Sequence, residues 1–262
     1  MFESSVYANR RRVLLERMLG AKGIAVFVGN VDAAMNYRGN DYKFRQDSSF
    51  MYYWGIDEPW FAAVLDLETG EECLYGNDVD IDDIIWMGPQ PTVASKGELI
   101  GCSNTAPLSE FDKKVADAVA KGRSVHFLPP ARYYNQMKLS QLTGIGADKV
   151  RKVAPVAAGG ASEELVKAVV SMRLIKEACE IEEIDKACEI GYEMHTVARQ
   201  GCKPGVLEQE IVGRMEGITL SKGWGVSFTT ILSQNGETLH NHSHHQIITP
   251  GRLLVVDAGA ES

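Results

Sequence analysis

Hydrophobic positions at the start of the chain change from helical spacing to a continuous run. Val13, Leu14 and Met18 recur at intervals that place them on one face of a helix over residues 7–19. The sequence IAVFV follows at residues 24–28 and contains no polar side chain. Such a short apolar run, bounded by glycine and asparagine, predicts a buried strand.

Strand patterns continue and alternate with helical ones. Residues 61–67 and 71–75 flank the turn sequence Glu-Thr-Gly, which predicts a β-hairpin. Residues 115–120 have a helical pattern, and residues 124–128 form an apolar run that two prolines end. Strands that alternate with helices indicate an α/β sheet domain.

A change in texture near residue 158 suggests a division of the chain. Residues 153–162 are small, uncharged and rich in Gly and Pro, which is typical of a linker. Ser162, followed by two glutamates, predicts the N-cap of a new helix. We therefore expect one domain over residues 1–158 and a second over residues 159–262.

Two longer helices and then strands are predicted for the second domain. Residues 176–199 and 206–221 carry helical patterns and are separated by a Pro- and Gly-containing turn. Strands are expected at residues 226–232, 246–249 and 253–256. The positions expected to face inward are Ile181, Ile184, Cys188, Gly191, His195 and Ala198 in the first helix, and Leu207, Ile211, Met215 and Leu220 in the second.

Composition narrows the classes of partner. The 262 residues are 45% hydrophobic and 24% charged, which is ordinary for a globular protein, and the net charge is −8. An acidic chain disfavours nucleic acid, and the cluster Arg10-Arg11-Arg12 is expected to be a solvated helix face. No apolar run approaches the ~20 residues of a membrane span. Five cysteines without a CxxC pair favour reduced thiols in the cytoplasm.

Residues 239–245, LHNHSHH, hold four of the six histidines of the chain. In an extended conformation His240, His242 and His244 would share one face, where neutral imidazoles could bind a metal. An exposed polar loop explains the same pattern, and the spacing alone slightly favours the loop.

Asp257 stands out because it follows the apolar sequence LLVV at residues 253–256. Such a run is typical of a strand that is buried on both faces of a sheet. A carboxylate at its end is costly unless a cation or several hydrogen-bond donors meet it. Asp257 is therefore a candidate metal ligand, with a carboxylate that accepts turn amides as an equal alternative.

Several motifs together resemble one family. The sequence FRQDSSFMYYWGIDEP at residues 44–59 resembles the N-terminal domain shared by aminopeptidase P, prolidase and creatinase. The sequence MRLIK at residues 172–176 resembles the entry to their catalytic domain, and CKPG at 202–205 with Glu208 resembles the turn between its first helices. The sequences GETLH and VVDAG, which contain His240 and Asp257, resemble the histidine and the first metal-binding aspartate of the family.

This resemblance implies a fold and a reaction. The fold would be mixed, α/β and α+β: a ribonuclease-H-like N-terminal domain followed by the N-terminal part of a pita-bread metallopeptidase domain. The activity would be release of the N-terminal residue from peptides with proline at the second position, using two divalent metals, usually manganese. Asp257 would be a metal ligand, and His240 would contact the substrate beside the metals. His242, His244 and His245 would then be loop residues.

The sequence also departs from the family pattern at its C-terminal end. A second aspartate, a histidine and two glutamates should follow Asp257, but only five residues do. One carboxylate and one histidine cannot close a two-metal site. We therefore expect the chain to be a fragment of a longer enzyme, to bind no metal tightly and to be inactive alone. We also expect residues 253–256 to be an open edge that promotes self-association.

Alternatives remain open at this point. Prolidase would cut only dipeptides, a creatinase-type hydrolase would use no metals, and a non-catalytic relative would bind peptides or partners. No nucleic acid or membrane is expected as a partner, whereas a homo-oligomer is. Tyr42, Arg45 and Trp54 could contribute to contacts between subunits, although packing in the core is the more conservative interpretation of Trp54.

Overall fold

The computed structural model describes all residues from Met1 to Ser262. The chain forms two compact units, Met1–Ile175 and Lys176–Ser262, which we call unit 1 and unit 2. The packing of helix α7 (Glu163–Arg173) explains why the units divide there, because its buried residues belong to the core of unit 1. The division of the chain into domains between residues 158 and 159 stays a prediction.

Unit 1 is built on a mixed five-stranded sheet with the order β4-β3-β2-β1-β5. Its strands are β1 (Ile24–Val28), β2 (Ala62–Asp66), β3 (Glu72–Tyr75), β4 (Thr105–Ala106) and β5 (Val125–His126). The three central strands are antiparallel, and the two outer strands each lie parallel to their neighbour. The predicted strand at 24–28 and the predicted hairpin at 61–75 are thus confirmed.

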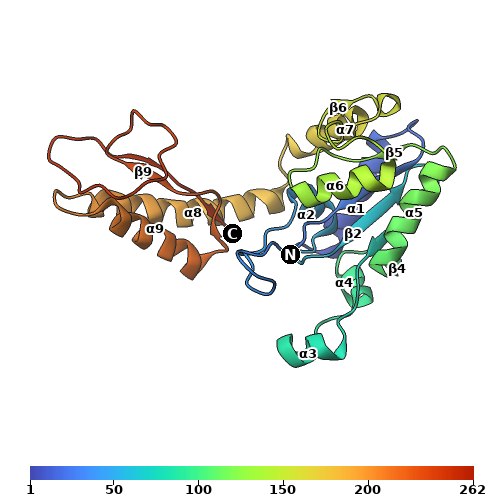
Figure 1. The fold of residues 1–262 in the computed structure, drawn as a ribbon, viewed down its shortest axis with the longest axis horizontal. Helices are drawn as coiled ribbons and strands as arrows, with labels where there is room; N and C mark the ends of the chain where they lie inside the picture. Colours follow the sequence, from blue (N-terminus) through green and yellow to red (C-terminus); the bar gives the residue numbers. More distant parts are fainter. The chain divides into compact units, whose positions relative to one another are not determined.

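Helices cover both faces of this sheet (Figure 1). Alternate residues of β1 point to opposite faces, so that Ala25 and Phe27 join one core cluster while Ile24 and Val26 join the other. This burial on both sides explains why the strand contains no polar residue. The first cluster is completed by α1 (Ser4–Arg17), α2 (Ser48–Trp54) and α7, and the second by α5 (Leu108–Ala120) and α6 (Tyr133–Thr143).

Two short helices lie between β3 and β4. They are α3 (Ile81–Met87) and α4 (Val93–Leu99). Helix α3 extends away from the sheet in Figure 1 and buries none of its residues. Asp80 begins it by accepting a hydrogen bond from the backbone N–H of Asp83 at 2.9 Å.

The arginine cluster of α1 is mostly buried, so the prediction of a solvated helix face is wrong. Arg10 and Arg11 are 2% and 1% exposed. The guanidinium of Arg10 lies 3.9 Å from the ring centroid of Tyr52 and donates to the Tyr52 carbonyl at 2.9 Å. Trp54 is also fully buried, as the core interpretation predicted.

The segment at 153–162 is ordered rather than a flexible linker, so this prediction is also wrong. It contains β6 (Val153–Ala154), a 3₁₀ turn (Val156–Ala158) and β7 (Ala161–Ser162), which pairs with β6. Its small residues permit close packing, and a Cβ at Gly160 would lie 2.6 Å from the carbonyl oxygen of Lys152. The predicted cap is confirmed, because the Ser162 hydroxyl accepts from the backbone N–H of Leu165 at 3.2 Å.

Unit 2 consists of two long helices and four short strands. The elements are α8 (Ala178–Gly201), α9 (Glu208–Lys222), β8 (Gly225–Val226), β9 (Ile231–Ser233), β10 (Val255–Asp257) and β11 (Ala260–Glu261). The two predicted helices and the turn between them are confirmed. They lie against each other (Figure 1), with Met194 and Ala198 of α8 in one core with Ile211 and Met215 of α9.

The inward face predicted for α8 is wrong at most of its positions, because Cys188 and His195 are exposed and only Ala198 is buried. Ile181 and Ile184 are 49% and 45% exposed, whereas Ile190 and Met194 are buried. In α9, the predicted burial of Ile211 and Met215 is confirmed, but Leu220 is exposed.

Strand predictions in unit 2 succeed only in part. The expected strand at 226–232 is divided between β8 and β9, and residues 246–249 contribute one isolated bridge, between Leu207 and Ile247. Of the apolar run 253–256, only Val255 and Val256 are in β10. No helix in the chain is both long and apolar enough to cross a bilayer.

Candidate functional site

The candidate site lies in unit 2, around β10 and the segment that precedes it. Strand β10 pairs with β9 in antiparallel register, with Val255 opposite Ser233 and Asp257 opposite Ile231. Side chains alternate along a strand, so Val255 and Asp257 point to the same side. Both are exposed, while Val256 between them packs against the core of unit 2.

The expected burial of the strand before Asp257 is wrong. Leu253 is 87% exposed and Val255 is 39% exposed, so the apolar run is not buried on both faces. The carboxylate of Asp257 is itself exposed, and water can hydrate it. Desolvation therefore does not require a cation at Asp257 in this chain, and its role as a metal ligand stays a prediction.

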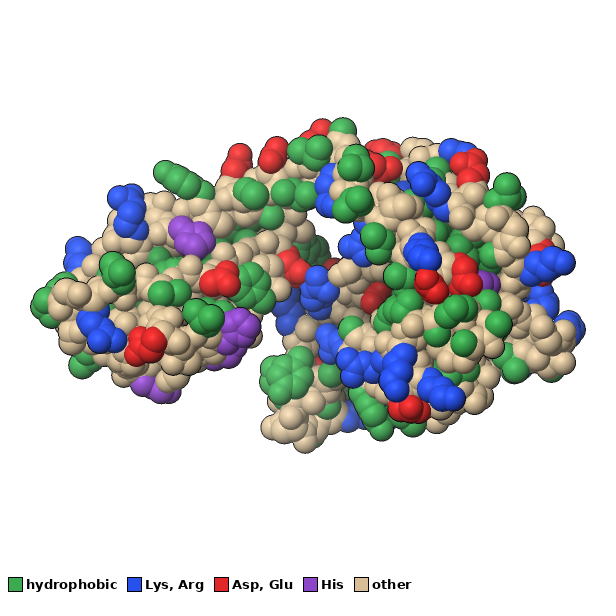
Figure 2. All heavy atoms as spheres, turned by 90° about the horizontal axis from the view of Figure 1, so that it is seen from above, with side chains coloured by type: hydrophobic (Ala, Val, Ile, Leu, Met, Phe, Trp, Pro, Cys, Tyr) green, Lys and Arg blue, Asp and Glu red, His purple; other side chains and the backbone are tan.

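His240 lies in the irregular segment between β9 and β10 and is exposed. His242 and His245 are exposed as well, and Figure 2 shows histidine side chains at the surface of unit 2. His244 differs, because it is 7% exposed and its Nδ1 lies 2.9 Å from the carbonyl oxygen of Leu232. The alternative with three histidines on one face is thus not met, and the favoured exposed loop fits His242 and His245 but not His244, which is packed.

Gln234 holds this histidine-containing segment in place. Its amide nitrogen donates to the carbonyl of Ile247 at 2.8 Å. Its amide oxygen accepts from the backbone N–H and the hydroxyl of Thr249, each at 3.0 Å. The side chain is 7% exposed, so these contacts replace the hydrogen bonds that water would supply. Nothing in the local sequence distinguishes Gln234 from a surface glutamine.

Glu208 connects α9 to the same segment. It is the first residue of α9 and is fully buried. Its Oε1 accepts from the backbone N–H of Gln234 at 2.7 Å, while its own N–H donates to the carbonyl of Gln246 at 2.9 Å. A carboxylate at the start of a helix is stabilised by the helix dipole. Glu208 therefore positions the loop, a role that the motif at residues 202–208 does not reveal.

These residues do not form a closed metal site. No three side chains of His, Cys, Asp or Glu are placed where they could hold one ion together. His240 and Asp257 provide one imidazole and one carboxylate, both exposed to solvent. A two-metal site needs several carboxylates and imidazoles around both ions, so the donor set of this chain does not fit such a centre.

Two family models match the chain in succession. Residues 7–126 match the aminopeptidase P N-terminal domain, and residues 182–262 match metallopeptidase family M24. The first match covers the sheet and helices of unit 1 through β5, and the second covers most of unit 2.

Curated relatives match nearly the whole chain. A Xaa-Pro aminopeptidase of Escherichia coli is 26% identical over 97% of this chain and 58% of the relative. Xaa-Pro aminopeptidase 3 of Rattus norvegicus is 25% identical over 98% of this chain and 52% of the relative. The chain thus spans about half the length of the curated relatives it matches.

Solved structures share the fold. The structure of Pseudomonas aeruginosa aminopeptidase PepP superposes with a TM-score of 0.80 and 22% identity, over 100% of this chain and 59% of that protein. The mixed α/β fold class expected from the sequence is therefore confirmed.

Proposed function

The chain belongs to the aminopeptidase P family of M24 metallopeptidases, and we propose that it is part of a Xaa-Pro aminopeptidase. It has a creatinase-type N-terminal domain, followed by part of a pita-bread domain. The reaction would release the N-terminal residue from peptides with proline at the second position. The succession of the two family matches along one chain carries this proposal. Divalent metals, with manganese as the candidate, would be the cofactors.

The names of the relatives favour an aminopeptidase over a prolidase. The proteins from Escherichia coli and Rattus norvegicus are both named Xaa-Pro aminopeptidases. A non-catalytic relative that binds peptides remains the second candidate, because this chain has no closed metal site.

Asp257 and His240 are the residues we propose for the site. Asp257 would be a metal ligand, since an exposed carboxylate on a strand can approach an ion. His240 would contact the substrate from the segment between β9 and β10. Because these two groups cannot enclose a metal by themselves, we propose that residues 1–262 alone are inactive and bind manganese weakly.

The proposal is tested by assaying the product of the complete reading frame and the chain 1–262 in parallel. The substrates are a Xaa-Pro-Xaa tripeptide, the same tripeptide with alanine at the second position, and a Xaa-Pro dipeptide, each with added Mn²⁺. We expect release of the N-terminal residue from the first substrate only, and only by the complete product. Hydrolysis by residues 1–262 would contradict the proposed inactivity of this chain, and cleavage of the dipeptide alone would replace the aminopeptidase with a prolidase.

The proposal also covers the cellular compartment and the partners of the protein. All five cysteines are free thiols, which suits a reducing compartment, and we propose the cytoplasm. The proposed partners are proline-containing peptides and further copies of the chain, with neither nucleic acid nor membrane among them. Light scattering of the purified complete product measures the number of copies.

A further inference from the structure

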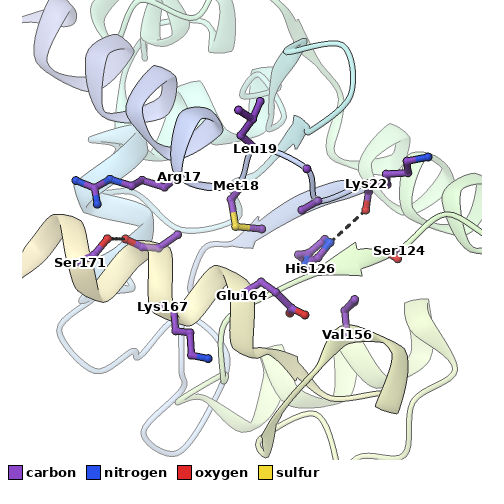
Figure 3. Close-up of a pocket in the computed structure, with 13 residues that line it drawn as sticks. Arg17, Met18, Leu19, Lys22, Ser124, His126, Val156, Glu164, Lys167 and Ser171 are labelled. Carbon is purple, nitrogen blue, oxygen red and sulfur yellow. Dashed lines mark hydrogen bonds between the residues drawn. The ribbon is translucent and has the colours of Figure 1, made fainter.

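Unit 1 contains a pocket that the proposed activity does not use (Figure 3). Its volume is about 600 Å³. The end of α1 and the loop after it contribute one wall, and β5 with the residue before it, the 3₁₀ turn at Val156–Ala158 and α7 contribute the others. His126 of β5 borders the pocket but is only 1% exposed. A titratable ring is thus buried beside a route by which protons can reach it from solvent.

His126 is one end of a chain of polar contacts that leads to α7. Its Nε2 lies 3.2 Å from the carbonyl oxygen of Lys22, and its Nδ1 lies 2.7 Å from the hydroxyl of Ser162. The same hydroxyl lies 2.9 Å from Oε2 of Glu164. It also accepts from the backbone N–H of Leu165 and so caps α7. The contacts therefore connect β5 to the first turn of α7.

Counting protons shows that this chain of contacts has two states. The carbonyl of Lys22 and an ionised Glu164 can only accept hydrogen bonds. A neutral His126 and the Ser162 hydroxyl supply one proton each, but the three contacts need three protons. When Nε2 of His126 donates to Lys22, the Ser162 proton can serve either Nδ1 or Glu164, but not both.

The charged groups around the ring act in opposite directions. Burial lowers the pKa of His126, while the Lys22 carbonyl and the charge of Glu164 oppose this shift. Lys22 from the loop, Arg17 from α1 and Lys167 from α7 line the same pocket, but Glu164 is the charged side chain that acts on the ring. Lys167 is partly neutralised by Glu163, 2.6 Å away.

We propose that His126, Ser162 and Glu164 form a proton-responsive link between β5 and α7. In the neutral state, Nε2–H of His126 donates to Lys22, and the Ser162 hydroxyl donates to Nδ1. On acidification, Nδ1 takes up one proton from solvent. The new Nδ1–H group then donates a hydrogen bond to the oxygen of Ser162. The hydroxyl hydrogen of Ser162 then turns to Oε2 of Glu164, so that all three contacts are hydrogen bonds.

The link gives the first turn of α7 two hydrogen-bonding arrangements at nearly the same geometry. The Leu165 N–H keeps its acceptor in both, because the Ser162 oxygen has a lone pair for it. Acid therefore changes which group accepts the hydrogen bond from the Ser162 hydroxyl, without removing the cap. We infer that this arrangement keeps α7 attached to β5 when His126 becomes charged.

Nitrogen-detected NMR of the ¹⁵N-histidine-labelled chain tests the proposal. At pH 7.5 the Nε2–H tautomer of His126 is expected, and lowering the pH until the ring titrates should yield the imidazolium. The matched variants are Glu164→Gln and Glu163→Gln, which each remove one charge from the first turn of α7. We expect the midpoint of the His126 titration to move to lower pH in Glu164→Gln and to be unchanged in Glu163→Gln.

The measurements on the unaltered chain keep the proposal testable if a variant folds poorly. An Nδ1–H tautomer at pH 7.5 would overturn it, because Ser162 could not then donate to the ring. Equal midpoints in the two variants would overturn it as well, since Glu164 would have no particular coupling to His126. A shift confined to Glu164→Gln, together with the Nε2–H tautomer, supports it.

Discussion

Arg11 and Glu72 form a bidentate ion pair between α1 and β3. The Nε of Arg11 donates to Oε2 of Glu72 at 2.7 Å, and Nη2 donates to Oε1 at 2.9 Å. The remaining donors serve backbone carbonyls, with Tyr53 and Ile100 each accepting at 2.9 Å. The guanidinium also lies 4.7 Å from the ring centroid of Trp54. One buried side chain thus joins α1, α2 and the sheet of unit 1.

Replacing Arg11 with lysine should destabilise unit 1. An ammonium cannot satisfy Glu72 and two carbonyls in different directions at once, so buried acceptors lose their partners. We expect a loss of about 2–4 kcal/mol in the free energy of unfolding, measured by urea denaturation. Arg12→Lys is the matched control, because Arg12 pairs with Glu16 on the surface with 60% of its side chain exposed. The control should change stability by less than about 0.5 kcal/mol, and equal losses would contradict the assigned role.

The burial of Arg10 and Arg11 shows what the linear sequence cannot reveal. Three consecutive arginines in a helix are normally solvated, and charge alone favours that interpretation. Their hydrogen-bond acceptors come from α2, β3 and the turn at residues 100–101, far along the chain, while Phe2 and Tyr7 add aromatic contacts to Arg10 from nearby positions. Only the tertiary fold brings these groups together, so local patterns could not have found them.

Local patterns succeeded where local forces decide the structure. The apolar sequence of β1, the turn between β2 and β3, and the cap of α7 each depend on residues within a few positions. Periodicity failed along α8, since Ile181 and Ile190 both suit a helical stripe. The tertiary contacts with α9 determine which stripe is buried. The candidate site shows the same limit of local patterns. Sequence motifs identified Asp257, but its exposure depends on how β10 pairs with β9 in the folded chain.

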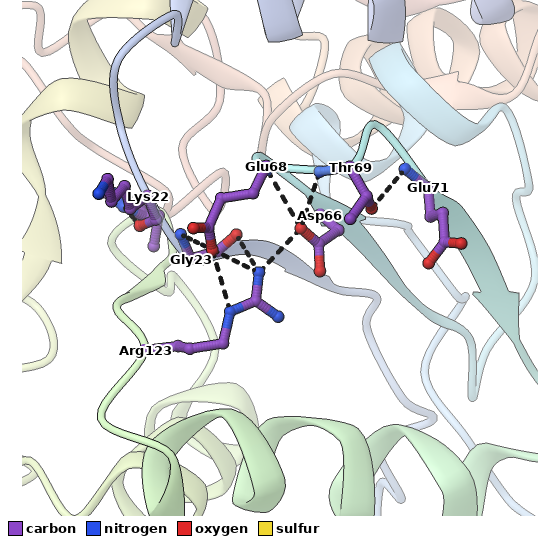
Figure 4. A network of polar contacts seen from close by, with 8 residues as sticks. Lys22, Gly23, Asp66, Glu68, Thr69, Glu71 and Arg123 are labelled. Carbon is purple, nitrogen blue, oxygen red and sulfur yellow. Dashed lines mark hydrogen bonds and ion pairs between the residues drawn. The ribbon is translucent and has the colours of Figure 1, made fainter.

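A second polar network, around Arg123, should make the stability of unit 1 sensitive to acid (Figure 4). Arg123 donates to Asp66 and to Glu68, at 2.8 Å in each case. Burial raises the pKa of Asp66, but the hydrogen bonds from Arg123 and two backbone N–H groups outweigh it, so the pKa lies below its ordinary value. A lowered pKa means that the unfolded state binds a proton first as pH falls.

Stability from this network should therefore be full above the ordinary pKa of 3.8 for Asp66 and be lost as pH falls through the lower folded value. We expect Arg123→Gln to unfold at lower temperature at pH 7 and to lose less stability between pH 5 and pH 3 than the unaltered chain. Thermal denaturation at several pH values measures both effects. Lys113→Gln, which removes an exposed pair with Glu110, is the control and should leave the pH dependence unchanged.

Gly55 and Gly144 offer a matched pair of helix C-caps. Both adopt left-handed backbone, with φ of 62° and 72°. A Cβ at Gly55 would lie 2.4 Å from Cζ of the buried Tyr7, whereas a Cβ at Gly144 meets nothing within 4 Å. Gly144→Ala should cost about 1–2 kcal/mol from backbone strain alone. Gly55→Ala should cost about 1–3 kcal/mol more from overpacking, measured by urea denaturation, and equal costs would exclude the close contact with Tyr7.

The exposed residues before and within β10 predict self-association of the chain. Leu253 and Val255 are 87% and 39% exposed, and β10 pairs only with β9, so its other edge has unpaired backbone groups. Such an edge promotes pairing with another chain. Sedimentation velocity should show a mass that rises with protein concentration, and a double Leu253→Lys, Val255→Lys variant should reduce this rise. Leu19→Lys is the control, because Leu19 is 91% exposed but lies in a turn of unit 1. A compact monomer at all concentrations, or an equal effect of the control, would show that this edge does not drive association.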